Sequence, residues 1–260
     1  MISSFYIGAT GLGAQQARID AISNNISNVN TTAYKQQRVS FEDLFYRPLL
    51  APTGLVSPLA GGLIGQGTAI ARTDTIFTPG DLQKTGNTLD VAIKGDGFFE
   101  VQLADGTRAY TRLGSLSLDS NGQLATQSGD LLTTQMTVPP DASNIQISEN
   151  GQVTATLASQ SQPATLGQLQ LSNFINPDGL QPLGSGLYAA TESSGQPYSA
   201  LPGQQGTGLL EQGYLEASNV DLASEMVNLV VAQQAYQISS KVVQISDQIL
   251  STIANLPSGA

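Results

Sequence analysis

The 260-residue sequence contains no cysteine, no histidine and no tryptophan. Without cysteine the chain forms no disulfide and offers a metal no thiolate ligand. Without histidine or cysteine, the Ser-His-Asp and Cys-His arrangements of hydrolases are also excluded. No lysine lies in a Ser-x-x-Lys context, and no G-x-x-x-x-G-K-[ST] phosphate-binding loop is present. We therefore predict no catalytic residues, no metal site and no cofactor.

Positive charge is also scarce. Ten Lys and Arg residues stand against twenty Asp and Glu residues, which gives a net charge of −10, and Lys241 is the only basic residue after Arg112. Binding to nucleic acid or to an anionic membrane surface needs clustered basic side chains, and this sequence has no such cluster. No stretch approaches the ~20 consecutive apolar residues of a membrane span. We therefore expect no nucleic-acid partner and a protein that is not membrane-embedded.

The N-terminus lacks the features of a cleavable secretory signal. The first positive charge is Arg18, and the apolar residues before it are interrupted by Gly8, Gly11 and Gly13. A signal peptide needs a basic segment followed by an uninterrupted apolar one. We expect that a protein with this sequence, if it leaves the cytoplasm, uses another export route.

Most polar residues of the chain are uncharged. It has 27 glycines and 12 prolines, 40% of its residues are hydrophobic and only 12% are charged. A surface rich in amides and hydroxyls suits extended contacts between subunits, because burying such groups costs less than burying ions. The same composition is equally typical of a glycine- and turn-rich β protein.

Both ends of the chain have helical periodicity. From Ile2 to Tyr34 the apolar residues recur mostly at steps of three, four or seven, which predicts an amphipathic helix with a narrow stripe. At the C-terminus the pattern is stronger and forms a heptad seam. Asn219 or Asp221 is the expected N-cap. The seam residues are Val231, Ala235, Ile238, Val242, Ile245 and Ile249, with Tyr236 in a second apolar row.

These two helices have two interpretations. They are either ordinary helices folded on a globular core, or partners that pair with each other and with other subunits. Their position at the two extreme ends, with a different region between them, favours pairing.

The middle of the chain is typical of β structure. Short segments alternate apolar and polar residues, and Asn121-Gly122 and Asn150-Gly151 are signals for hairpins with type I′ turns. Asp119 begins a sequence like half of a calcium loop, but the terminal Glu is missing, so we interpret it as a hairpin. We expect a mostly antiparallel β domain.

An unusual connector, residues 45–67, precedes the β domain. It is rich in proline and glycine but retains aliphatic residues, which disordered linkers usually lack. A flexible loop is one interpretation; we favour an extended arm that docks on another surface. Its expected rigid anchors are Pro48, Leu49, Pro52, Leu55 and Pro58.

Together these patterns predict an α+β fold with four segments. Residues 1–44 form an N-terminal helical segment and residues 214–260 a C-terminal one, and the two pair in a coiled-coil-like domain. Residues 45–67 form the connector arm, and residues 68–213 form the central β domain.

Several motifs resemble those of the flagellar rod and hook family. Residues 24–35 (NNISNVNTTAYK) are similar to its N-terminal signature, and residues 218–227 (SNVDLASEMV) with 234–236 (QAY) to its C-terminal signature. Residues 90–99 (DVAIKGDGFF), 110–112 (YTR) and 206–214 (GTGLLEQGY) resemble its central β domain and the return from it. The similarity runs in the right order through nearly the whole chain. One departure is Gln234, where the family often has Arg.

Within this family, residues 1–4 (MISS), 10–16 (TGLGAQQ) and 41–44 (FEDL) look like those of distal rod subunits. The resemblance implies a non-enzymatic structural subunit of the bacterial flagellar basal body, exported through the flagellar export apparatus. It implies self-assembly into a helical polymer that transmits torque from the motor to the hook.

Other expected partners are the proximal rod proteins, the hook protein, the P-ring and L-ring proteins and the rod cap. The implied location extends from the periplasm to the outer membrane. On the N-terminal helix the expected assembly residues are Leu12, Ile19, Ile22, Asn25, Ile26, Asn28 and Tyr34. The alternatives are another rod or hook protein, or a secreted β-domain adhesin or enzyme.

Overall fold

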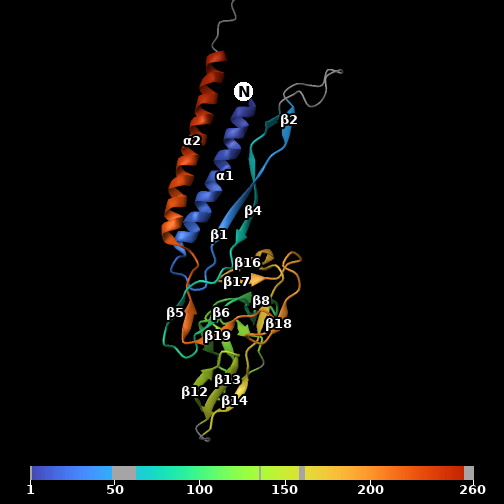
Figure 1. Ribbon diagram of the computed structural model, residues 1–260, viewed down its shortest axis with the longest axis vertical. Coiled ribbons are helices and arrows are strands. Elements are labelled where there is room, and N and C mark those ends of the chain that lie inside the picture. Colours follow the sequence, from blue (N-terminus) through green and yellow to red (C-terminus); the bar gives the residue numbers. More distant parts are fainter. Residues whose placement is uncertain (1, 49–62, 135, 158–161, 255–260) are drawn as a thin grey trace, which may run out of the picture. The chain divides into compact units, whose positions relative to one another are not determined.

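Two long helices at the chain ends lie side by side in the computed structural model, which describes residues 2–48, 63–134, 136–157 and 162–254 (Figure 1). Helix α1 spans Ile2–Ser27 and helix α2 spans Leu222–Ala254. They run antiparallel, because Gly8 of α1 lies against Val243 of α2 while Asn25 bonds Glu225 near the start of α2.

The chain divides into two units, which we describe separately. The first unit contains both helices and a β ribbon, within Met1–Ser27, Gln37–Thr75 and Asp221–Ala260. The second unit comprises Asn28–Gln36 and Ile76–Val220 and contains the remaining strands. The chain therefore passes between the units after residues 27, 36, 75 and 220.

Helix α1 ends at Ser27, so the prediction of a helix to Tyr34 is wrong for its last seven residues. The backbone N–H of Thr31 bonds the carbonyl of Asn28, and its hydroxyl bonds the Asn28 side chain. Ala33 then adopts a left-handed φ of 55°. Asn and Thr side chains that bond nearby polar groups compete with helical hydrogen bonds.

The N-cap of α2 is Asp221, not Asn219. The backbone N–H of Ala223 donates to Asp221 Oδ1 at 3.0 Å, and Ser224 Oγ donates to Oδ2 at 2.7 Å. These bonds, that of Ser224 above all, lower the pKa of Asp221. The first turn thus begins with an acid that satisfies otherwise unpaired backbone donors.

A long antiparallel ribbon completes the first unit. Strand β1 (Gln37–Asp43) pairs with β4 (Thr68–Thr75), with a bulge between Ser40 and Phe41. Strand β2 (Tyr46–Pro48) pairs with β3 (Leu63–Gly65). The prediction that residues 1–44 form a helical segment is therefore wrong for β1. Strand β4 was expected in the β domain, but it belongs to the unit that contains the helices. Both differences arise because β1 pairs with β4, about 30 residues later in the chain. Local sequence patterns do not encode such pairing.

The second unit is built around a seven-stranded antiparallel sheet of order β16-β17-β8-β7-β11-β10-β9. Its strands are β7 (Phe99–Gln102), β8 (Arg108–Thr111), β9 (Leu116–Leu118), β10 (Leu124–Thr126), β11 (Leu131–Leu132), β16 (Gln181–Gly184) and β17 (Leu187–Ala189).

Smaller antiparallel sheets complete this unit (Figure 1). One is three-stranded: β12 (Ala142–Ile147), β13 (Gln152–Leu157) and β14 (Ala164–Gln168). Three strand pairs are β15 (Leu171–Asn173) with β18 (Tyr198–Ala200), β6 (Val91–Lys94) with β19 (Leu209–Gln212), and β5 (Leu82–Lys84) with β20 (Tyr214–Glu216). A short 3₁₀ helix, η1, spans Pro177–Gly179. The predicted mostly antiparallel β domain is confirmed.

Four hairpins share one turn geometry. In residues 103–107, 119–123, 126–130 and 148–152, the fourth residue is a glycine whose N–H donates to the carbonyl of the first. Only this glycine has positive φ, 77° at Gly122 and 84° at Gly151. That is a type I turn closed by a glycine bulge. The hairpins are confirmed, but the predicted type I′ turn is wrong, because Asn121 and Asn150 do not adopt positive φ.

The core of the second unit is aliphatic along the sheets and aromatic at one site. Val91, Val101, Val153, Leu169 and Leu171 are wholly inaccessible to solvent. A separate cluster packs aromatic rings edge to face: Phe77, Phe98, Tyr110, Phe174 and Tyr188.

Candidate assembly interface

Small residues bring α1 close to α2. A Cβ added at Gly8 would lie only 2.7 Å from Val243 Cγ2, and one at Gly11 would lie 3.5 Å from Ser239 Oγ. Ala14 on α1 and Ala232 on α2 are buried. The inner face of the pair is therefore lined by small side chains, which permit close backbone approach.

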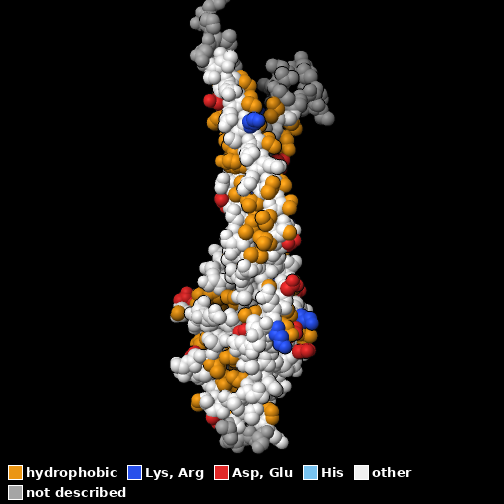
Figure 2. All heavy atoms as spheres, turned by 90° about the vertical axis from the view of Figure 1, so that its left-hand side faces the viewer, with side chains coloured by type: hydrophobic (Ala, Val, Ile, Leu, Met, Phe, Trp, Pro, Cys, Tyr) orange, Lys and Arg blue, Asp and Glu red, His pale blue; other side chains and the backbone are white. Residues whose placement is uncertain are grey.

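The heptad residues of α2 lie beside this inner face and remain exposed. Five of the six expected seam residues are between 43% and 65% exposed: Val231, Ile238, Val242, Ile245 and Ile249. The sixth, Ala235, is half-buried, and Tyr236 is 37% exposed. Figure 2, viewed from the side of α2, shows hydrophobic side chains along this helix with little charge among them. We call the five exposed residues the outer row.

The expected residues of α1 are placed differently. Ile22 and Asn25 are buried, and Leu12, Ile19 and Ile26 are half-buried. Asn28 and Tyr34, which follow the helix, belong to the second unit and are half-buried. The role of all these residues in assembly remains a prediction.

Asn25 joins three segments of the first unit. Its Nδ2 donates to the Gln37 carbonyl at 2.9 Å, and Gln37 N–H donates back to Oδ1 at 2.9 Å. Nδ2 also lies 3.2 Å from Glu225 Oε2, and both side chains are buried. One amide thus connects α1, the start of β1 and the first turns of α2.

A buried ionic cluster connects separate segments of the second unit. Lys35 Nζ donates to Glu216 Oε1 at 2.6 Å, and Arg112 Nε donates to Glu216 Oε2 at 2.7 Å. The side chains of Lys35 and Glu216 are 0% exposed and that of Arg112 is 2% exposed. Glu216 also accepts the Gly80 N–H, and Lys35 donates to the Thr78 carbonyl. All three charges are therefore both paired and hydrogen-bonded, which buried ions require.

Arg112 has further partners. Its guanidinium donates to the carbonyls of Ile93, Gly95 and Gly97 at 3.3, 2.9 and 3.0 Å. Its Cζ also lies 5.9 Å from the centre of the Phe98 ring. The planar guanidinium thus fixes the loop between β6 and β7 while holding the carboxylate.

The cluster shifts two pKa values. The pKa of Lys35 is lowered to about 8, mainly by burial and also by the Arg112 charge, and Glu216 only partly offsets these effects. For Glu216, burial alone would raise the pKa, but the nearby charges of Arg112 and Lys35 outweigh it and hold the pKa below its usual value. Glu216 is therefore ionised at neutral pH.

Asn219 completes this arrangement. Its Oδ1 accepts the Gln36 N–H at 2.7 Å, and its Nδ2 donates to the carbonyl of Ile76 at 2.8 Å. Gln36, Ile76 and Asn219 each lie next to a point where the chain passes to the first unit. We call Lys35, Arg112, Glu216 and Asn219 the junction cluster. The family motifs contain Lys35, Arg112 and Asn219 but not Glu216, which lies between residues 206–214 and 218–227. Only the burial of isolated charges, which a sequence does not show, would have identified the four residues as one site.

The connector lies largely outside the described residues. Pro48 ends β2, with its backbone opposite Leu63 of β3. The expected anchors Leu49, Pro52, Leu55 and Pro58 lie outside the described residues.

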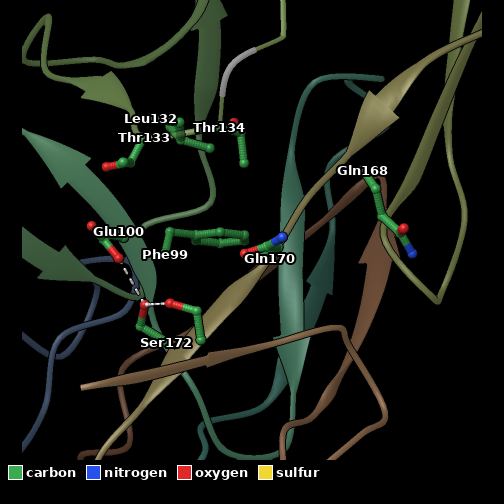
Figure 3. Close-up of a pocket in the computed structure, with 9 residues that line it drawn as sticks. Phe99, Glu100, Leu132, Thr133, Thr134, Gln168, Gln170 and Ser172 are labelled. Atoms are coloured by element: carbon green, nitrogen blue, oxygen red, sulfur yellow. Dashed lines mark hydrogen bonds between the residues drawn. The ribbon is translucent and has the colours of Figure 1, made fainter. Parts of the chain in front are cut away.

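The second unit contains a polar pocket of about 330 Å³ (Figure 3). Ser172 Oγ donates to Glu100 Oε2 at 3.1 Å, and Glu100 Oε1 lies 3.1 Å from Arg108. Phe99 and Gln170 also line this pocket. A carboxylate paired with arginine is a weak base for a serine hydroxyl, and the sequence has no histidine to take that role. The pocket therefore contains no catalytic arrangement.

Within the part of the chain that the structure describes, neither helix is long and apolar enough to cross a membrane. Nor do Asp and Glu side chains there gather in a group of three or more that could hold a metal ion.

Comparison with known proteins agrees with the motifs. Residues 92–155 match the flagellar hook protein FlgE/F/G D1 domain, residues 211–256 the flagellar basal body rod FlgEFG protein C-terminal domain, and residues 5–35 the flagella basal body rod protein family.

Full-length relatives agree as well. The flagellar basal-body rod protein FlgG of Buchnera aphidicola subsp. Schizaphis graminum is 46% identical, covering 98% of this chain and all of the relative. The FlgG proteins of Borreliella burgdorferi and Bacillus subtilis are 44% and 38% identical, each with 98% of this chain and 99% of the relative covered. This family is structural and not enzymatic, and the chain belongs to the flagellar basal-body rod proteins.

Proposed function

We propose that this protein is the structural subunit of the distal rod and assembles through the outer row of α2. Subunits joined in this way would form a tubular shaft that transmits torque. The observation that carries the proposal is the exposure of Val231, Ile238, Val242, Ile245 and Ile249 while α1 already covers the neighbouring face of α2.

The energetics favour an additional partner for this surface. Full burial of one aliphatic side chain stabilises by roughly 1.5–3 kcal/mol, so five side chains in one row form a substantial interface. A contiguous exposed apolar patch on a soluble protein usually marks an interaction site. Another copy of α2 presents the same periodic row, which suits a repeating lattice.

The family supports the wider context of the proposal. We propose that the subunit reaches its place through the flagellar export apparatus under the rod cap, without a cleavable signal peptide. There it would lie between the proximal rod proteins and the hook protein, within the P-ring and L-ring proteins. Its location would extend from the periplasm to the outer membrane.

The test places one charge in the outer row. Ile249→Asp puts a carboxylate where burial is proposed, and desolvating an unpaired carboxylate costs several kcal/mol. Polymerisation of the purified protein and motility of cells should both fail, while the second unit stays folded. Gln237→Asp is the matched control, because this exposed residue lies about 100° around the helix from its neighbour Ile238. Full-length rods built from Ile249→Asp subunits would show that the outer row is not the interface.

A further inference from the structure

The second unit contains five places where a glycine follows an aspartate or an asparagine. These pairs are Asp96-Gly97, Asp105-Gly106, Asn121-Gly122, Asn150-Gly151 and Asp178-Gly179. At such a pair the backbone can react with its own side chain, because glycine has no side chain to hinder the approach of its nitrogen.

The reaction is a rearrangement that needs only water. The glycine nitrogen loses its proton and forms a bond to Cγ of the preceding residue. Cγ in turn expels water from a protonated aspartate carboxyl, or ammonia from an asparagine amide, and a cyclic succinimide results. Water then opens the ring at either of its two carbonyl carbons. One product is aspartate, and the other is isoaspartate, in which the backbone runs through the side-chain carbon and is longer by one atom.

Hydrogen bonds occupy four of the five glycine nitrogens. The N–H groups of Gly106, Gly122, Gly151 and Gly179 each donate to the carbonyl of the residue three positions earlier, at 2.9, 3.1, 2.9 and 3.2 Å. To react, such a nitrogen must first break this bond, lose its proton and turn toward the neighbouring side chain. The fold therefore protects these four pairs.

The side chains of three of these pairs are engaged as well. Asp105 Oδ1 accepts the hydroxyl of Thr107 at 2.6 Å and its backbone N–H at 2.8 Å. These bonds, that of the hydroxyl above all, lower the pKa of Asp105, and an ionised carboxylate does not expel water. The side chains of Asn121 and Asn150 are hydrogen-bonded within their own turns.

Asp96-Gly97 differs from the other pairs in both reacting groups. Within the described residues, the Gly97 N–H donates to no acceptor, and the exposed Asp96 carboxyl has neither a hydrogen bond nor an ion pair. The bond that holds this peptide goes to its oxygen, because the Asp96 carbonyl accepts the Gly208 N–H at 2.7 Å. In a trans peptide the N–H lies on the opposite side from the carbonyl. The reacting side of the peptide is therefore unoccupied.

Solvent also reaches this pair. Gly97 is buried as a residue, but Asp96 and Gly97 both line a pocket of about 520 Å³ within the second unit. Water for the opening of the succinimide is therefore available at the site.

We propose that Asp96 is the position at which the folded chain isomerises, through a succinimide formed with Gly97, while the other four pairs are protected. Isoaspartate at this position lengthens the loop between β6 and β7. Arg112 holds that loop through the carbonyls of Gly95 and Gly97, so the product would loosen the guanidinium and with it the junction cluster. The inference concerns the folded second unit and does not depend on the proposed polymer.

The test uses Asp96→Asn, which gives the chain three Asn-Gly pairs of the same intrinsic reactivity. The full-length variant is incubated at neutral pH, and peptide mass spectrometry measures the loss of ammonia at each pair. One hydrogen bond biases a site against the open form by up to about tenfold, so the new asparagine should deamidate about tenfold faster than Asn121 and Asn150. In urea, where the turns are unfolded, all three should react at similar rates.

The parent chain gives a second measurement, independent of the variant. A methyltransferase specific for isoaspartate labels the incubated protein, and peptide mapping locates the label. Isoaspartate should accumulate at position 96 about tenfold faster than at position 105, for the same reason. Asp96→Glu is the matched control: it keeps the charge, but its longer side chain does not form a succinimide, so the label at position 96 should disappear.

The two measurements can each overturn the inference. Equal deamidation at positions 96, 121 and 150 of the folded variant would show that the hydrogen bonds give no protection. If Asp96→Asn does not fold, the parent chain decides, and as much label at Asp105 as at Asp96 overturns the inference. A failure of the parent chain to polymerise would count against the proposed function and leave this inference standing.

Discussion

Lys35 and Glu216 are 181 positions apart in the sequence, yet their side chains meet at 2.6 Å with no exposure to solvent. Lys35 precedes the ribbon of the first unit by two residues, and Glu216 closes the last strand before α2. The ion pair therefore holds together the two segments through which the β domain continues into the ribbon and the C-terminal helix.

The first prediction removes the charge of Glu216. Glu216→Gln leaves Lys35 and Arg112 buried without a counter-charge, and breaking a buried pair in this way costs about 3–5 kcal/mol. Chemical denaturation at neutral pH should show a loss of this size in the free energy of unfolding. Glu192→Gln changes the same group at an exposed site and should cost less than about 0.5 kcal/mol. Equal effects of the two variants would contradict the role of the cluster.

The second prediction concerns acid. Because the folded-state pKa of Glu216 lies below its unfolded value of 4.5, its contribution to stability is present above about pH 4.5. That contribution is lost as the pH falls through the folded-state pKa. The gap in unfolding free energy between the parent and Glu216→Gln should therefore narrow as the pH falls below 4.5. A gap that stays constant from pH 7 to pH 3 would show that this carboxylate is not held ionised.

The third prediction concerns two glycines of α1. Gly→Ala inside a helix usually stabilises by about 1 kcal/mol. Gly13→Ala should do so, because nothing lies within 4 Å of the added Cβ. Gly8→Ala should destabilise instead, by about 1–3 kcal/mol, because its Cβ would overlap the branched side chain of Val243. The thermal dissociation of assembled polymer measures both. Stabilisation by both variants would contradict the close helix contact.

The fourth prediction concerns the free monomer. A helix pair with an exposed apolar row and a glycine-interrupted partner has little packing to offset the cost of helix nucleation. Backbone amides of residues 2–30 and 225–255 should exchange rapidly in the monomer and slowly in the polymer. Amides of β6, β7 and β13 in the second unit serve as an internal control and should be protected in both. Strong protection of both terminal segments in a verified monomer would refute coupled folding.

The fifth prediction concerns stiffness. Each proline fixes φ and lowers the entropy lost when a segment docks. We therefore expect the connector to lock neighbouring subunits. Deleting residues 49–62 and joining β2 to β3 by a short turn should still allow assembly, but into a bendable or curved tube. Electron microscopy of purified rods gives the persistence length. A deletion variant as straight as the parent would place rigidity elsewhere.

Local patterns in the sequence predict what local interactions determine. The 3.6-residue period predicts both helices, and glycines after Asp or Asn predict the hairpins. The residue at which α1 ends was not predicted. It depends on hydrogen bonds of Asn28 and Thr31 that compete with helical ones, and the apolar stripe does not show these. Strand β1 was missed because it is short and carries four charged or amide side chains among seven residues.

The two parts of the candidate site differ in how far the sequence predicts them. The outer row was predicted from its heptads, but its exposure depends on the small residues that let α1 occupy the adjacent face. The junction cluster was not predicted as a site, because Lys35 and Arg112 lie in separate motifs and Glu216 lies in none of them. Their common burial follows from the tertiary fold alone.

Gly8 and Gly11 have a further consequence for the shaft. The two glycines, three positions apart, meet Val243 and Ser239 on successive turns, so a slip of one helical turn, about 5.4 Å, would bring larger side chains into the same narrow contact. The pair therefore has a single register. Every copy then presents the outer row at the same height relative to its own N-terminus. A polymer of identical subunits would then accumulate no error in length, because the contact between α1 and α2 gives every copy the same dimensions.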